Sequence, residues 1–75
     1  MNIRLSNALL HLAGPRVGNE VRKLVRELKR LAGVVRVVPS TKVPRLLSIN
    51  YDPRMVQARA IVQYVRRGWT GTRLV

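Results

Sequence analysis

The residues best suited to chemistry lie in a glycine-bounded loop that precedes a basic segment of the chain. Gly14 and Gly18 bound this loop, Arg16 lies inside it, and Glu20 follows it. If a helix begins after the loop, its first N–H groups could hold an anion, and Arg16 would add positive charge. However, no Lys-Ser or Lys-Thr pair follows as in a P-loop, and the Glu20 carboxylate would repel an anion. The loop is thus either a weak anion site or a structural turn.

The chain lacks the combinations of side chains that metal binding and catalysis usually need. The chain contains no cysteine, and a Cu(I) site needs soft, deprotonated sulfur ligands. His11 is the only histidine, and the three acidic residues, Glu20, Glu27 and Asp52, are spread along the chain. A nucleophile, a base and an orienting group cannot be assembled from this set. We therefore expect neither enzymatic activity nor a bound cofactor, and we expect His11 to lie on an exposed sheet face.

The glycine loop is followed by an amphipathic helix. Its apolar residues recur at the spacing of a helix that buries one face. These residues are Val17, Val21, Leu24, Val25, Leu28 and Leu31. The opposite face is basic and carries Arg22, Lys23, Arg26, Lys29 and Arg30. Glu20 suits the positive N-terminal end of this helix, and Gly33 suits the position just beyond its C-terminal end.

The remaining elements predict a βαββαβ order. Apolar and β-branched segments predict strands over 8–13, 34–38, 45–51 and 70–75. Residues 2–7 could extend the first of these strands. A second helix is expected over 53–67, with proline in its first turn. This order is that of an α+β, ferredoxin-like fold, with two helices on one face of a four-stranded antiparallel sheet.

The other face of the predicted sheet is expected to be open. Side chains alternate between the two faces of a strand. In the third strand this places Leu47, Ile49 and Tyr51 on one face. The open face is expected to display Leu9, His11, Arg36, Val38, Leu46 and Ser48. Because this face is partly apolar and no helix covers it, we expect it to bind a protein partner or a second copy of the chain. Pairing of an edge strand would extend such an assembly.

Four short motifs follow one another along the chain. They are the glycine loop before Glu20, Leu31-Ala32-Gly33-Val34, Tyr51-Asp52-Pro53 and Gly68-Trp69. Their order and spacing resemble the heavy-metal-associated domain of copper chaperones and metal-pumping ATPases, and the resemblance covers roughly residues 8–75. It implies a single heavy-metal-associated-like domain over 1–75. It also implies that the aromatic ring of Trp69 packs under the first loop.

The resemblance fails at the two positions that carry the family's chemistry. The family places cysteines three and six residues after the loop glycine, where this chain has Val17 and Glu20. Valine cannot ligate a metal, and a carboxylate is a hard ligand unsuited to Cu(I). The resemblance therefore implies a domain whose metal-binding motif is lost, and a degenerate metal chaperone remains one alternative.

The charge of the chain points to an anionic partner. Fifteen Lys and Arg residues face three acids, so the formal net charge is +12, which creates a strong positive field around so small a domain. We expect a non-catalytic protein-interaction module or a subunit of a larger assembly. The charge could serve an acidic protein surface, a membrane surface or a nucleic acid. The alternative is a basic protein that binds a nucleic acid backbone without sequence preference. That alternative would use Arg16, Arg22, Arg26, Arg30, Arg59, Arg66 and Arg67.

Two further expectations concern location. No apolar run approaches the roughly 20 residues that span a bilayer, and the N-terminal segment has no convincing cleavage site. We therefore expect no transmembrane segment and a cytoplasmic domain.

Overall fold

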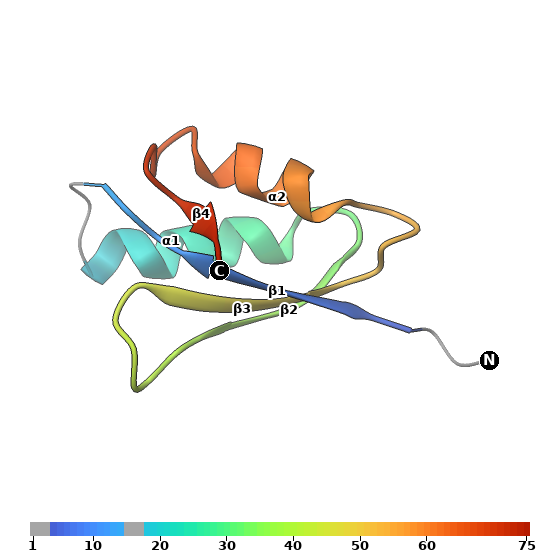
Figure 1. Ribbon diagram of the computed structural model, residues 1–75, viewed down its shortest axis with the longest axis horizontal. Coiled ribbons are helices and arrows are strands. Elements are labelled where there is room, and N and C mark those ends of the chain that lie inside the picture. The colour runs from blue at the N-terminus through green and yellow to red at the C-terminus, as the bar shows by residue number, and fades with distance from the viewer. Residues whose placement is uncertain (1–3, 15–17) are drawn as a thin grey trace.

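The computed structural model describes residues 4–14 and 18–75 (Figure 1). The elements are β1 (Ser6–His11), α1 (Gly18–Lys29), β2 (Val34–Pro39), β3 (Leu46–Tyr51), α2 (Ala58–Val65) and β4 (Arg73–Leu74). The four strands form one antiparallel sheet in the order β2-β3-β1-β4. Figure 1 shows both helices on the same side of this sheet. The predicted α+β, ferredoxin-like fold is therefore confirmed.

The core lies between the sheet and the two helices, as the apolar patterns predict. In β3, Leu47, Ile49 and Tyr51 are buried, whereas the residues between them are partly exposed. The helices contribute Leu24 and Leu28 from α1, and α2 contributes a buried set of its own. That set is Ile61, Val62 and Val65. The alternation of each strand thus decides which face the helices cover.

The second helix begins later than predicted. It starts at Ala58 rather than at residue 53, because the preceding segment forms a separate turn. An oxygen of the Asp52 carboxylate accepts the backbone N–H of Arg54 at 2.9 Å, and the Asp52 carbonyl accepts the N–H of Val56 at 3.1 Å. Gln57 then takes an extended conformation, with φ −100° and ψ 152°, which no helix interior allows.

The first and last strands also differ from their predicted bounds. The first spans Ser6–His11, so it ends two residues before the predicted residue 13 and includes part of the segment 2–7 that could extend it. The last is limited to Arg73–Leu74 rather than 70–75, because the backbone N–H of Thr72 donates to the carbonyl of Trp69 at 3.0 Å and closes a turn there. Alternation predicts the faces of these strands but not the residues at which pairing stops.

Two loops are fastened together at the end of the molecule away from the glycine loop. The backbone N–H of Asp52 donates to the carbonyl of Gly33 at 2.7 Å. Gly33 has a φ of +91°, and a Cβ at this position would lie 2.8 Å from a side-chain carbon of Val56. Glycine is needed here both for its conformation and for this close approach. The joint holds the start of β2 against the turn that leads into α2.

The carboxylate of Asp52 makes the stability of this joint depend on pH. Hydrogen bonds from the Arg54 side chain and backbone hold the pKa of Asp52 below its ordinary value of 3.8, and the two side chains form an ion pair at 3.1 Å. A carboxyl group with a lowered folded pKa contributes stability above its unfolded pKa. That contribution is lost as the pH falls through the lowered folded value.

We therefore predict that acid weakens the native domain more than the variant Asp52→Asn. Denaturant midpoints of the two proteins should converge as the pH falls from neutral to well below roughly pH 4. Arg54→Gln is the matched control, because it removes the partner and should flatten the same part of the pH profile. Parallel profiles for the native domain and both variants would contradict the assigned role of Asp52.

Candidate functional site

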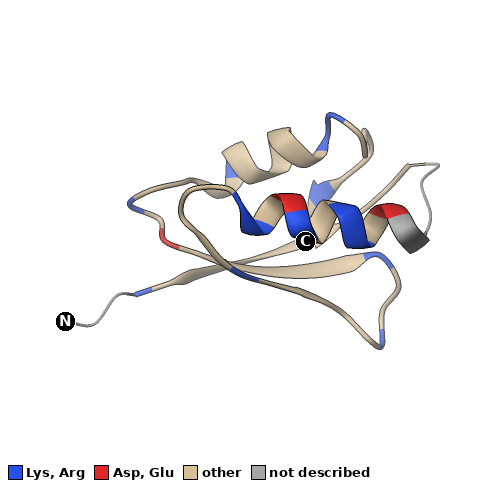
Figure 2. Ribbon diagram, turned by 180° about the vertical axis from the view of Figure 1, so that it is seen from behind, with Lys and Arg blue, Asp and Glu red and all other residues tan. Residues whose placement is uncertain are grey.

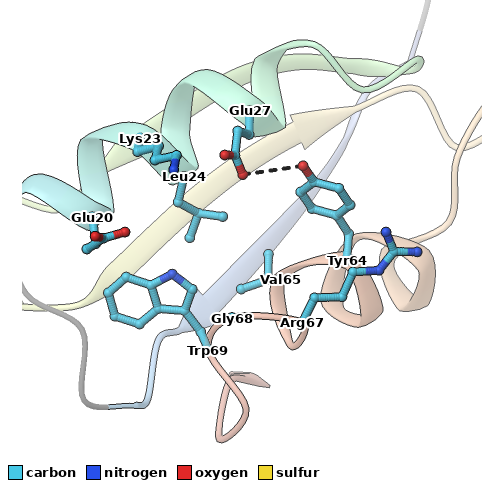
Figure 3. Close-up of a pocket in the computed structure, with 9 residues that line it drawn as sticks. All are labelled: Glu20, Lys23, Leu24, Glu27, Tyr64, Val65, Arg67, Gly68 and Trp69. Carbon is cyan, nitrogen blue, oxygen red and sulfur yellow. Dashed lines mark hydrogen bonds between the residues drawn. The ribbon is translucent and has the colours of Figure 1, made fainter.

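A hollow lies between the two helices (Figure 3). Residues 15–17 lie outside the described part of the chain, so the positions of Arg16 and Val17 stay predictions. Glu20 lies in the first turn of α1, where it is half-buried. It lines a hollow of about 260 Å³. The other lining residues are Lys23, Leu24, Glu27, Tyr64, Val65, Arg67, Gly68 and Trp69.

Trp69 lies against the first loop, as the family resemblance implies. Its side chain is buried, and its Cα and Cε3 atoms lie 3.6 Å and 3.9 Å from where a Cβ of Gly14 would be. The backbone N–H of Gly71 donates to the carbonyl of Ala13 at 3.1 Å and fastens the two loops. Trp69 therefore supports the loop and forms a wall of the hollow.

The hollow is lined by two acidic and two basic side chains, and some of its polar groups contact one another. The hydroxyl of Tyr64 donates to the Glu27 carboxylate at 3.3 Å, and the Arg67 guanidinium lies 5.5 Å from the centre of the Tyr64 ring. Glu20 and Glu27 are matched in number by Lys23 and Arg67. In the described residues, no three His, Cys, Asp or Glu side chains come together to hold a metal ion.

The open sheet face brings together all six residues predicted to lie on it. Leu9 pairs with Ser48, His11 pairs with Leu46, and on the other side of β3 Ser48 pairs with Val38. Arg36 pairs with Asn50 in the adjacent row. Their chain neighbours Leu10, Val37 and Leu47 are buried toward the helices, so the six side chains lie on the opposite face. Leu9 and Val38 are 37% and 40% exposed.

The structure adds further residues to the open face. Asn7 donates to the Ser48 hydroxyl at 2.8 Å and to the Asn50 side-chain oxygen at 2.7 Å, so one end of the face is a polar network. Arg73 pairs with His11, and the N–H of Val75 donates to the carbonyl of Leu9. The alternation through Leu9 could have identified Asn7. Placing Arg73 and Val75 on the open face required the register of β4 against β1, which the sequence did not reveal.

The open face is basic as well as apolar. The three acidic side chains of the chain lie elsewhere, because Glu20 and Glu27 are on α1 and Asp52 is paired with Arg54 beyond the end of β3. Every Lys and Arg that the structure describes is exposed, and Figure 2 shows them spread over the helices, loops and strand ends. The open face therefore combines apolar side chains with positive charge.

The arginines of the nucleic-acid alternative do not form one stripe. Arg22 and Arg26 line a groove beside Pro39 of β2, whereas Arg59 and Arg66 line a groove beside Leu74 of β4. β2 and β4 are the two opposite edges of the sheet. These four cations therefore lie on opposite flanks of the helical layer.

The two remaining described arginines of that set, Arg30 and Arg67, lie in different places. Arg30 follows the last residue of α1 and lines a hollow with Lys23, Arg26 and Glu27. The Arg67 guanidinium lies over the ring of Tyr64. The Nε of Arg66 donates to the carbonyl of Thr72 at 2.7 Å, which gives Arg66 a structural role. Whether any of the set contacts an anion stays a prediction.

No aromatic side chain is available to stack on a base. Tyr51 is part of the core, and Tyr64 and Trp69 lie between the helices. The chain contains no phenylalanine. RNA-binding sheets of this topology use aromatic side chains on their open face, which the described strands lack.

Comparison with known proteins supports the fold. A solution structure described as that of a "putative copper-ion-binding protein" from Bacillus anthracis matches the chain with a TM-score of 0.76 and 19% sequence identity. The match covers 99% of this chain and 100% of the Bacillus protein. The likeness is one of fold. No family model and no curated protein matches the chain.

The two helices are too short to cross a membrane. Within residues 4–14 and 18–75, no helix combines the length and the apolar character that a bilayer span needs.

Proposed function

We propose that the chain is a non-catalytic, metal-free domain of heavy-metal-associated-like fold that docks on an acidic surface of a partner protein. The observation that carries this proposal is the open sheet face, where Leu9, Val38 and Leu46 lie near cationic side chains and away from the three acidic side chains of the chain. Apolar surface gains about 25 cal/mol for each Å² removed from water. An acidic rim on the partner would add attraction to Arg36 and Arg73.

The fold neighbour favours a metal carrier as a second candidate, but the residues of this chain oppose it. The Bacillus protein is named for copper binding. The family's cysteine positions correspond here to Val17 and Glu20, and neither side chain is a soft ligand for Cu(I). We therefore propose that the fold is retained as a scaffold for protein contact.

Binding to a nucleic acid backbone is the other candidate, and it is favoured by the exposure of every described Lys and Arg. The two candidates differ in what they require. Phosphate contacts depend on charge, fall steeply with salt and tolerate an apolar-to-polar change on the sheet. Docking through the open face requires its apolar centre.

The test is affinity capture with three forms of the domain, after nuclease treatment. Leu46→Glu places a charge in the apolar centre and leaves the core intact, because Leu46 points away from the helices. Met55→Glu is the matched control, since Met55 is 63% exposed in the turn before α2 and the charge change is the same. We expect a protein that is retained by the native domain and by Met55→Glu but lost with Leu46→Glu.

Two results of this experiment count against the proposal. Equal retention of the partner by Leu46→Glu and Met55→Glu would remove the open face from the contact. Loss of all binding on nuclease treatment would favour the nucleic acid backbone. Circular dichroism of Leu46→Glu must show a folded domain for the comparison to hold.

A further inference from the structure

The two edges of the sheet offer different opportunities for an added strand. Edge strands expose unpaired N–H and C=O groups that a second chain can bind. At β4 the edge is two residues long, and the adjacent carbonyl of Thr72 is occupied by the Arg66 side chain. At β2 the edge is six residues long. The β2 edge is therefore the better template for a partner strand.

The hydrogen bonds of β2 indicate which groups face outward. The backbone N–H of Ser40 donates to the carbonyl of Leu46 at 2.8 Å. Because such bonds alternate along an antiparallel ladder, Val38 and Arg36 also bond inward to β3. The N–H and C=O of Val37 and the C=O of Pro39 then point away from the sheet. Pro39 has no N–H to leave unpaired, which is why proline is tolerated at an edge.

A groove runs along the helix side of this edge. Val21 and Val25 of α1 and Pro39 of β2 line it, and Arg22 and Arg26 complete its lining. Its volume is about 460 Å³. None of its lining residues is acidic, so it combines apolar walls with two positive charges.

We propose that an extended segment of a partner protein, alternating apolar and acidic residues, adds to the β2 edge as a fifth strand. A residue opposite Val37 shares the helix side of the sheet with it, so an apolar side chain there enters the groove. In the partner segment, the residues on either side of this apolar residue lie on the open-face side of the sheet. An acidic residue there meets Arg36 across the strands. The irregularity between Val34 and Arg36 confines the pairing to the second half of β2. This inference rests on the proposed function in taking the partner to be an acidic protein.

The test uses a fluorescent peptide of alternating valine and glutamate and measures its anisotropy with the intact domain. N-methylation of the valines blocks the N–H groups that would bond to β2, and we expect it to weaken binding at least about tenfold. N-methylation of the glutamates leaves those groups intact and should change affinity less than about twofold. Absence of binding, or equal effects of the two methylations, would overturn the added strand.

Two variants on one helix separate the groove from general charge. Arg22→Glu changes the groove lining and should weaken binding of the unmethylated peptide about fivefold. Lys29→Glu makes the same charge change on α1 away from the groove. We expect it to weaken peptide binding by less than about half as much as Arg22→Glu does. Equal effects of the two variants would indicate purely electrostatic association and overturn the proposal.

Failure of the added strand is distinguishable from failure of the proposed function. The methylated peptides test the β2 edge, whereas Leu46→Glu tests the open face in partner capture. If methylation of the valines weakens peptide binding while the Leu46→Glu variant still retains the partner, the proposed role of the open face is contradicted and the strand pairing at β2 is supported. If Leu46→Glu loses the partner while methylation has no effect, the edge pairing alone is overturned.

Discussion

The double variant Val17→Cys with Glu20→Cys is expected to bind one Cu(I) ion with nanomolar or tighter affinity, whereas the native domain should bind none at that level. The family resemblance assigns both cysteine positions to these residues, and Glu20 lies in the first turn of α1 as that assignment requires. Two thiolates supply the soft ligands that Cu(I) prefers. Competition against a chromophoric chelator measures both proteins directly.

The matched control for this gain of metal binding is Val17→Ser with Glu20→Ser. It removes the carboxylate and changes the same positions without adding sulfur, so it should behave like the native domain. Failure of the cysteine pair to bind copper would show that the resemblance places the loop in the wrong register. A tight copper site in the native domain would contradict the proposal that the domain is metal-free.

Trp69→Ala is expected to bring the domain close to unfolding. Trp69 is 3% exposed and packs between the first loop and the helices. Removing a buried tryptophan costs about 3–5 kcal/mol. A chain of 75 residues has a total stability of roughly 4–11 kcal/mol. Since Trp69 is the only tryptophan, urea unfolding followed by circular dichroism is the appropriate measurement.

Tyr64→Phe is the control for Trp69→Ala, because it changes an aromatic residue of the same hollow without opening a cavity. It removes only the 3.3 Å hydrogen bond to Glu27, and we expect a loss of about 1 kcal/mol or less. If Trp69→Ala proves no more destabilising than Tyr64→Phe, the tryptophan does not support the loop as described.

The sequence predicted the layers of the fold well, because burial imposes a period on the chain. Alternation in β3 separated Leu47 and Ile49 from Leu46 and Ser48, and these faces are confirmed. The start of α2 was missed because its position depends on the local turn at Asp52, whose side chain competes with the helix for backbone N–H groups. Side-chain capping of this kind has no periodic signal.

The candidate surfaces were predicted only in part for a similar reason. The open face followed from alternation within single strands. Its extension by Arg73 required the register of β4 against β1, and the groove lined by Val25 and Pro39 required the placement of α1 along the edge of the sheet. These features arise from segments that are far apart in the chain, and the pattern of any one segment does not contain them.

If the open sheet face, rather than the glycine loop, contacts the partner, the contact is visible in amide NMR spectra of the isotope-labelled domain recorded with and without the captured partner. We expect shifts and line broadening to centre on Leu9, Val38 and Leu46, while the first turn of α1 at Glu20 and the backbone of Trp69 remain unchanged. Perturbations concentrated at Glu20 and Trp69, with the sheet unaffected, would contradict the proposed contact.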